Sequence, residues 1–188
     1  MRQIIFDLDE TIYKKKELRI KREQAILEFL GERKEEYNKL KENHGTIESL
    51  RLLNIKREKF FDLMNKVPIL LEKDLKLIDL MEKLKSKYKI IILSNSSSYC
   101  LYQTLEKLGI LNLVDKYYSG EDFKNPKPAK ECFFMVKKGD ICVGNNFKKD
   151  LQIPKQLGAI TVLLGDFKNE ADFNIHDIYE LKELLDII

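Results

Sequence analysis

Apolar residues follow two different spacings along the chain. Short, continuous apolar runs rich in β-branched residues occur at Gln3–Phe6, Tyr88–Leu93, Ile141–Val143 and Ile160–Leu164. Runs of this length and composition are typical of buried strands. From Lys14 to about Asn65, apolar residues instead recur at helical spacing among Lys, Arg and Glu. The pattern therefore predicts alternating strands and helices, with an all-helical block inserted after the first strand.

Capping and breaking residues place the helices between these strands. The expected helices are Ile47–Leu53 with Thr46 as its cap, Lys56–Asn65, Asp74–Lys85 with Asp74 as its cap, about Ser98–Leu108 ended by Gly109, Pro128–Val136, a helix containing Leu151 and Leu157, and Ile178–Ile187. Pro154 should kink the helix that contains it or delay its start. A further short strand is expected near Tyr117 and Tyr118.

Continuous apolar strands that alternate with helices indicate a parallel α/β sheet covered on both faces. In such sheets ligands bind outside the carboxyl ends of the strands. Polar residues follow three of the predicted strands at this end, namely Asp7 and Asp9, Ser94 and Asn95, and Asn145. A loop residue, Lys127, can reach the same edge. The sequence therefore predicts one polar site that several strands share.

Composition limits the kinds of partner. The 188 residues include 44% apolar and 35% charged residues, with a net charge of only +3 and acidic residues interleaved with basic ones. This pattern is typical of solvated helix faces rather than of a nucleic-acid-binding surface. The three cysteines form no metal-binding or disulfide pattern. We find neither a signal peptide nor a membrane-spanning run, and expect a cytoplasmic protein that binds neither nucleic acid nor membranes.

The polar residues at the strand ends suit phosphate chemistry. Two carboxylates as close as Asp7 and Asp9 are costly to bury unless a cation joins them, and Mg²⁺ prefers oxygen ligands of this kind. A helix cap is the ordinary alternative for Asp9 alone. Lys127 lies between two prolines, which restrict its backbone, and can neutralise phosphate oxygens, to which Ser94 can donate a hydrogen bond. These groups favour phosphoryl transfer.

The same residues lie in segments that resemble the motifs of the haloacid dehalogenase (HAD) superfamily, in the superfamily's order. These segments are Phe6–Thr11, Ile92–Asn95, Lys127–Phe133, and Gly144-Asn145 with Asp150. The resemblance implies a Rossmann-like core formed by residues 1–13 and 74–188, with residues 14–73 as a small all-helical cap.

The resemblance also implies roles for individual residues. Asp7 would form an aspartyl-phosphate intermediate, and Asp9 would act as general acid and then as general base. The carboxylate of Asp7, the main-chain carbonyl of Asp9 and the fourth motif, with Asn145 and Asp150, would hold Mg²⁺. Ser94 and Lys127 would complete the catalytic set, and Thr11 and Asn95 are expected to contact the substrate. The expected substrate is a small phosphorylated metabolite.

A further likeness concerns the expected cap. The stretch His44-Gly45-Thr46, followed by Leu50 and later Val67-Pro68, resembles the cap of pyrimidine 5′-nucleotidase-like members. Within the superfamily, the chain is similar to the pyrimidine 5′-nucleotidase and phosphoglycolate phosphatase-like phosphatases. This likeness makes nucleoside monophosphates one candidate substrate class and His44 a candidate substrate contact. A helix cap or a surface position is the ordinary alternative for this histidine.

Asn145 departs from the motif, because phosphatases usually carry Asp at this position. The amide keeps a ligand oxygen but removes a negative charge, so weaker Mg²⁺ binding is expected. Two alternatives follow from this residue, a 2-haloacid dehalogenase that uses Asp7 without metal, and a catalytically weakened binding protein with the same fold. Asp9 opposes the first, because a halide leaving group needs no proton. The retained Asp7, Ser94 and Lys127 oppose the second.

Overall fold

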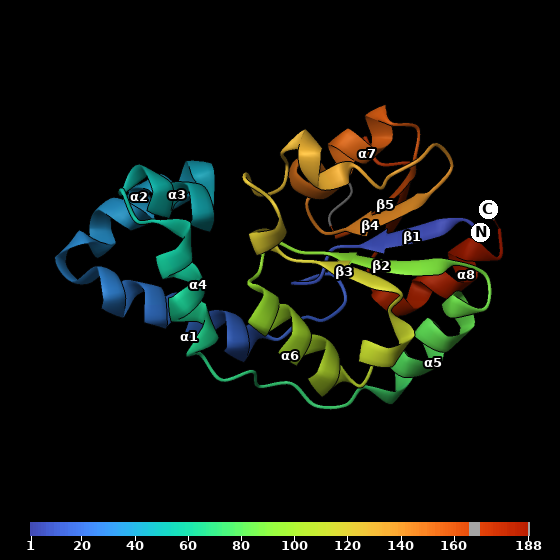
Figure 1. Cartoon of the computed structure of the whole chain (residues 1–188), viewed down its shortest axis with the longest axis horizontal. Coiled ribbons are helices and arrows are strands. Elements are labelled where there is room, and N and C mark those ends of the chain that lie inside the picture. Colours follow the sequence, from blue (N-terminus) through green and yellow to red (C-terminus); the bar gives the residue numbers. More distant parts are fainter. Residues whose placement is uncertain (166–169, 188) are drawn as a thin grey trace. The chain divides into compact units, whose positions relative to one another are not determined.

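A computed structural model describes residues 1–165 and 170–187 of the chain. Its centre is a six-stranded sheet in the order β3-β2-β1-β4-β5-β6, with every neighbouring pair parallel (Figure 1). The strands are β1 (Gln3–Phe6), β2 (Lys89–Leu93), β3 (Lys116–Tyr118), β4 (Ile141–Gly144), β5 (Ile160–Leu164) and β6 (Phe173–Ile175). The predicted parallel α/β sheet is confirmed, and β6 is a strand that the sequence did not predict.

Side chains alternate between the two faces of the sheet, as the pleat of a strand requires. On β1, Ile4 and Phe6 pack on the face covered by α5 (Leu75–Lys85), α6 (Ser98–Leu108) and α8 (Leu181–Leu185). Ile5 points to the other face, where it joins residues of η4 (Lys130–Phe133) and residues next to α7 (Gln152–Gln156). Figure 1 shows α5 and α8 on one side of the sheet and α7 on the other. Both faces are therefore buried along the central strands β1, β2, β4 and β5, whose buried side chains are mainly apolar.

The chain divides into two compact units. One consists of Met1–Lys14 and Leu71–Ile188 and contains the sheet, and the other is Lys15–Leu70. The second unit is all-helical, with α1 (Lys16–Leu30), η1 (Gly31–Arg33), α2 (Lys34–His44), α3 (Thr46–Leu52) and α4 (Arg57–Asn65). Its interior includes the buried side chains of Leu18, Ile26, Tyr37, Leu53 and Phe61. Its bounds start one residue later and end three residues earlier than the 14–73 expected for the cap.

Two of the expected helix ends are present, and a third is not. The Asp74 side chain caps α5 by accepting a 3.0 Å hydrogen bond from the backbone N–H of Leu77. Gly109 ends α6 with a left-handed backbone, φ 79°. Thr46 was expected to cap α3, but it is the first residue of that helix and Gly45 precedes it at the cap position, so this prediction was wrong.

Three helices of the sheet-containing unit differ from their predicted form. A single 3-10 turn, Lys130–Phe133, replaces the helix expected at Pro128–Val136, because a turn with Ala129 N bonded to Pro126 O at 3.0 Å precedes it. A π-helical turn, Phe147–Leu151, precedes α7, so Pro154 falls within the first turn of that helix, where proline is tolerated. The closing helix is the 3-10 turn Ile178–Glu180 followed by α8.

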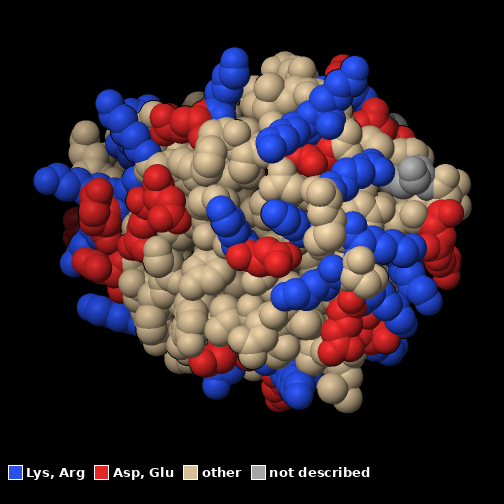
Figure 2. Space-filling view, turned by 45° about the vertical axis from the view of Figure 1, so that its right-hand side comes forward, with Lys and Arg blue, Asp and Glu red and all other residues tan. Residues whose placement is uncertain are grey.

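Charged side chains of both signs are interspersed over the face shown in Figure 2. This is the arrangement that the interleaved sequence predicts for solvated helix faces. Within the described ranges, no helix combines the length and the apolar character that crossing a membrane would require.

Candidate active site

The carboxyl ends of β1, β2 and β4 lie side by side because these strands are neighbours in the sheet. Asp7 directly follows β1 and continues its pairing with β4 through a 2.9 Å bond from its backbone N–H to Val143 O. Ser94 follows β2 and donates its backbone N–H to Tyr118 O on β3 at 2.9 Å. Asn145 follows β4. The topology thus brings together the strand-end residues that the sequence singled out.

Lys127 is the centre of the polar cluster. Its ammonium donates to Asp7 Oδ1 at 2.7 Å, to Asp150 Oδ1 at 2.7 Å and to the Leu93 carbonyl oxygen at 2.8 Å. An ammonium has three N–H donors, so this side chain is fully satisfied. The side chains of Lys127 and of both acids are almost completely buried. Burying a lysine with two carboxylates is tolerable only because the charges are paired at hydrogen-bond distance.

Asn95 fixes the backbone of Lys127. Its Oδ1 accepts from Lys127 N at 2.8 Å and its Nδ2 donates to Lys127 O at 3.1 Å, so both ends of the amide are used. The sequence predicted Asn95 as a substrate contact. In the structure this side chain is bonded to the loop that carries Lys127, whose ammonium lies beside Asp7, and a contact with substrate stays a prediction.

Gly144 makes room for Asp150. A Cβ atom built on Gly144 would lie 2.5 Å from the Cβ of Asp150, closer than real carbon atoms approach. The other carboxylate oxygen of Asp150 accepts from the backbone N–H of Asn146 at 3.2 Å. Asp150 was predicted as a metal ligand, and that role stays a prediction; in the structure one of its oxygens accepts from Lys127 and the other from Asn146 N. The Asp150 carboxylate is a buried counter-charge to the Lys127 ammonium.

The charges in the cluster act on one another. Burial raises the pKa of Asp7 above its ordinary value, and the nearby carboxylate of Asp150 raises it further, against the lowering effects of Lys127 and Lys149. Burial alone would lower the pKa of Lys127, but the carboxylates of Asp150 and Asp7 outweigh it and raise that pKa above its ordinary value. Lys127 is therefore a permanent cation at neutral pH, placed against the carboxylate of Asp7.

The other oxygen of Asp7 and the side chain of Asp9 are held by hydroxyl groups. Thr11 Oγ1 donates to Asp7 Oδ2 at 2.9 Å. Tyr13 donates its hydroxyl to Asp9 Oδ1, and Ser96 Oγ donates to Asp9 Oδ2 at 2.7 Å. Asp9 is half-buried, whereas Asp7 is only 6% exposed. The two neighbouring carboxylates thus have different surroundings, one paired with an ammonium and one held by hydroxyls.

The oxygens around Asp7 are of the kind that Mg²⁺ takes. Thr11 Oγ1 lies 2.9 Å from Asp7 Oδ2 and 3.5 Å from Asn145 Oδ1, so a carboxylate and an amide oxygen lie against one hydroxyl. Magnesium sites commonly use one or two carboxylates and complete their shell with waters and substrate phosphate. Among the described residues, no three acidic, His or Cys side chains are grouped to hold a metal ion. A magnesium ion here would therefore rely on main-chain and amide oxygens in addition to Asp7.

Two residues of this cluster, Tyr13 and Ser96, were not predicted from the sequence. Ser96 belongs to a serine run whose other members looked equivalent, and Tyr13 lies beyond the motif in a loop. Tyr13 lies four residues after Asp9, and Ser96 lies two residues after Ser94. Only this closeness to predicted site residues could have drawn attention to them. Predicted substrate contact His44 is exposed at the end of α2 in the helical unit. Its role stays a prediction.

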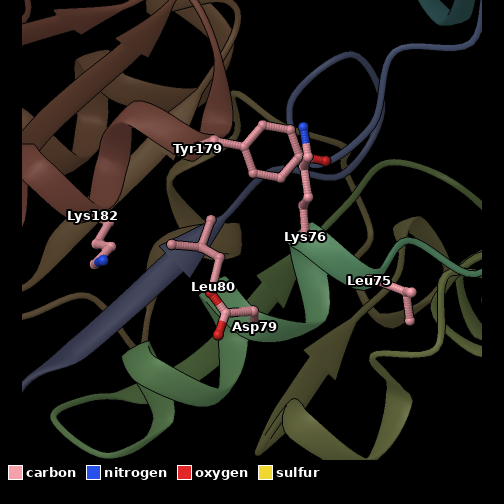
Figure 3. A pocket seen from close by; sticks show the side chains of 6 residues that line it. All are labelled: Leu75, Lys76, Asp79, Leu80, Tyr179 and Lys182. Carbon is pink, nitrogen blue, oxygen red and sulfur yellow. The ribbon is translucent and has the colours of Figure 1, made fainter.

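A hollow of about 380 Å³ lies apart from these residues. Figure 3 shows its lining, which α5 contributes together with Tyr179 and Lys182. The Tyr179 hydroxyl donates to Asp74 Oδ2 at 2.6 Å, which ties it to the start of α5. None of the lining residues belongs to the strand-end cluster.

Comparison with known proteins agrees with this architecture. The model of the haloacid dehalogenase-like hydrolase family matches residues 4–139. No curated protein matches the chain by sequence. Similar solved structures include a HAD phosphatase from Thermococcus onnurineus (21% identity, 98% of each chain covered, TM-score 0.71). The HAD-hydrolase YfnB from Bacillus subtilis, solved bound to magnesium, is also similar (17%, 98% of each chain, 0.67). So is a 2-haloacid dehalogenase from Pseudomonas syringae pv. Tomato DC3000 (17%, 100% of this chain and 99% of that one, 0.63). At these identities the likeness shows the fold.

Proposed function

The chain belongs to the haloacid dehalogenase-like hydrolase family, and from that premise we propose that it is a Mg²⁺-dependent phosphatase of small phosphomonoesters. One observation carries the proposal. A buried carboxylate, Asp7, is paired with the ammonium of Lys127 at 2.7 Å, while Asp9, two residues later, is held outside that ion pair by hydroxyls. One acid is thus placed as a nucleophile beside a cation, and the other is available to exchange a proton.

The proposed reaction has two halves. In the first, a carboxylate oxygen of Asp7 forms a bond to phosphorus while the bond from phosphorus to the ester oxygen breaks, and Asp9 gives that oxygen a proton. In the second, Asp9 takes a proton from water, the water oxygen attacks the aspartyl phosphate, and inorganic phosphate leaves. Asp7 and Asp9 are regenerated, so the cycle balances.

The surrounding residues orient the reacting groups. Lys127 neutralises Asp7 and the phosphate oxygens that approach it, and Asn95 and Asp150 hold Lys127 in place. Ser94 is buried at the same strand end, and we assign its hydroxyl to the phosphate. Thr11 fixes the second oxygen of Asp7. We therefore assign Asn95 and Asp150 to the support of Lys127 rather than to direct contact with substrate or metal.

The oxygens described above fit magnesium, with the Asp7 carboxylate, the main-chain carbonyl of Asp9 and the Asn145 amide as its protein ligands. When bound, the ion would neutralise phosphate charge and help orient the phosphate. Asp150 lies close to this set through Lys127 but is not needed as a ligand. The magnesium bound to the similar Bacillus subtilis protein supports this part of the proposal.

Asn145 keeps a dehalogenase as the second candidate function. This amide, together with a fold shared with 2-haloacid dehalogenases, is what such an enzyme would show. Asp9 favours the phosphatase, because an alkoxide leaving group needs a proton and a halide does not. The intact ion pair of Asp7 and Lys127 also speaks against a binding protein without catalysis. We further propose that the enzyme acts in the cytoplasm on a phosphorylated metabolite, with nucleoside monophosphates, contacted by His44, as the first class to assay.

The test is hydrolysis of p-nitrophenyl phosphate and a panel of phosphomonoesters, with and without Mg²⁺, by the wild-type chain and by Asp7→Asn. The substitution keeps the shape of the side chain but removes the nucleophile, so we expect release of phosphate to fall by at least 100-fold. A 2-haloacid serves as the control substrate. Equal phosphate release by wild type and Asp7→Asn would exclude the mechanism, and halide release without phosphate release would select the dehalogenase.

A further inference from the structure

The carboxylate of Asp9 is bound at both of its oxygens by side chains that have no part in the mechanism above. Tyr13 donates its phenolic hydroxyl to Oδ1, and Ser96 donates its hydroxyl to Oδ2 at 2.7 Å. The two donors come from different strand ends, since Tyr13 follows β1 and Ser96 follows β2. Two hydrogen bonds, one to each oxygen, restrict rotation of the carboxyl group about its last side-chain bond.

The backbone fixes the place of both donors. After Asp9, the chain turns through Glu10 in a left-handed conformation, φ 62°, and an isolated bridge pairs Asp9 with Tyr13. This return brings the phenol of Tyr13 back onto the acid four residues before it. On the other side, Ser96 N donates to Ser94 Oγ at 3.1 Å, and Ser96 O accepts from Gly120 N at 2.8 Å. A left-handed non-glycine residue is strained, and such strain is retained where the surroundings demand it.

We propose that Tyr13 and Ser96 are positioning residues for the acid and base Asp9. The inference rests on the proposed phosphatase mechanism and adds two residues to it. Asp9 gives its proton to the leaving oxygen and later takes one from water, while Tyr13 and Ser96 keep their own protons throughout. Their contribution is to hold the carboxyl group in one orientation, because proton transfer depends steeply on the alignment of donor and acceptor.

This role predicts a dependence on the leaving group. Nitrophenolate leaves without a proton, whereas phenoxide, which titrates near 10 as the tyrosine side chain does, needs one. The ratio kcat/KM reports only the steps through release of the phenol, where Asp9 is the acid. Tyr13→Phe should therefore lower kcat/KM for phenyl phosphate by about 10-fold, part of the roughly 100-fold or more that general acid catalysis supplies. For p-nitrophenyl phosphate, the change should stay within about 2-fold, because that step does not need the acid.

We expect the hydroxyl of Ser96 to position Asp9 in the same way as the hydroxyl of Tyr13. Ser96→Ala removes the hydroxyl that binds Oδ2 and should produce the same selective loss with phenyl phosphate. Ser96→Thr restores a hydroxyl and should recover most of it. In an Asp9→Asn background, neither Tyr13→Phe nor Ser96→Ala should lower kcat/KM further, because residues that act through one group are not additive.

The experiment measures kcat/KM for both aryl phosphates across these variants, with Tyr117→Phe as the matched control. Tyr117 is 43% exposed on β3 and has no place in the site, so its substitution should leave both values unchanged. Thermal unfolding of each variant checks that the fold is intact. Equal losses with both substrates, or additional losses in the Asp9→Asn background, would overturn the positioning role.

Failure of this inference can be told apart from failure of the proposed function. If wild type hydrolyses both esters and Asp9→Asn selectively loses phenyl phosphate, the mechanism holds. Wild-type behaviour of Tyr13→Phe and Ser96→Ala would then overturn the positioning role alone. If the wild-type chain releases no phosphate from either ester, both proposals fall together.

Discussion

Asn145 sets the charge of the proposed metal site at the residue scale. It follows β4 with its Oδ1 3.5 Å from the hydroxyl that also binds Asp7. An amide oxygen can ligate Mg²⁺, but it carries no charge to offset the two charges of the ion. The carboxylates of Asp7 and Asp150 are already shared with Lys127. The proposed magnesium site thus has less negative charge than an Asp at this position would provide.

Asn145→Asp should therefore tighten Mg²⁺ binding. The added carboxylate should lower the Kd by about 10-fold, which corresponds to about 1.4 kcal/mol. Calorimetric titration of the protein with Mg²⁺ measures this Kd in the absence of substrate. The matched control is Asn146→Asp, which adds the same charge one residue further on, where the side chain caps Lys149 N at 3.0 Å. Equal tightening by both variants would show that Asn145 does not touch the ion.

The sequence predicts those site residues whose position follows from the order and direction of the strands. Asp7, Ser94 and Asn145 follow strands, and the carboxyl ends of neighbouring parallel strands must meet, so their proximity follows from the sequence pattern. The function of Asn95 and the involvement of Tyr13 depend instead on side-chain directions after a turn. Spacing along the chain does not determine those directions, and only the folded geometry shows them.

At the scale of elements, the strongly apolar strands, the longer helices and the short strand β3 were predictable, whereas β6 and the 3-10 and π-helical turns were not. Strands β1, β2, β4 and β5 coincide with the continuous apolar runs of the sequence, and such runs are typical of buried strands. In contrast, β6 is only Phe173–Ile175 and contains the exposed Asn174, so its sequence carries no strand signal. It forms because β5 offers a free edge, and Val162 pairs with Phe173 in register. Tertiary pairing, rather than local preference, determines such an element.

The Asp172 side chain, directly before β6, is hydrogen-bonded to Thr161 on β5. A substitution at Asp172 therefore tests whether tertiary contacts stabilise β6. The Asp172 carboxylate accepts from Thr161 N at 2.9 Å, from Thr161 Oγ1 at 2.7 Å and from Lys155 Nζ at 2.9 Å. Burial raises the pKa of Asp172, but the hydrogen bonds from Thr161 and Lys155 outweigh it, so the pKa lies below its ordinary value. The stabilisation is therefore present above the unfolded-state pKa, near 3.9, and is lost as the pH falls through the folded-state value.

Asp172→Asn should lower the free energy of unfolding by about 1 kcal/mol at pH 7. The difference from wild type should shrink below about pH 4, as the Asp172 carboxylate takes up a proton first in the unfolded chain and then in the folded one. Urea unfolding at several pH values measures the loss of unfolding free energy at pH 7 and its decrease at low pH. Asp186→Asn is the control, since Asp186 pairs with Lys87 at 3.2 Å on the surface, and exposed pairs contribute little. A difference that persists unchanged at pH 3 would contradict the role of the charge.

At the scale of the whole molecule, the chain builds one unit from two separated segments and inserts the other between them. The strands β1 and β4 are adjacent in the sheet although the inserted Lys15–Leu70 separates β1 from all later strands. The sheet-containing unit has two buried faces with large apolar clusters. The helical unit is much smaller, and the fraction of surface that a compact unit buries falls with its size. The two units should therefore differ in local stability.

Hydrogen exchange should resolve this difference. We expect amides in α1 to α4 to exchange through openings of lower free energy than amides in β1, β2, β4 and β5. Ile26→Ala in the helical unit and Val162→Ala in β5 are a matched pair, because both side chains are at most 2% exposed. Truncation of a buried side chain costs about 1–5 kcal/mol, so each variant should lose protection mainly within its own unit. Hydrogen exchange measured by mass spectrometry on peptides from both units shows whether the two units differ in local stability. If Ile26→Ala lowered protection in the sheet as much as in the helices, the two units would unfold as one.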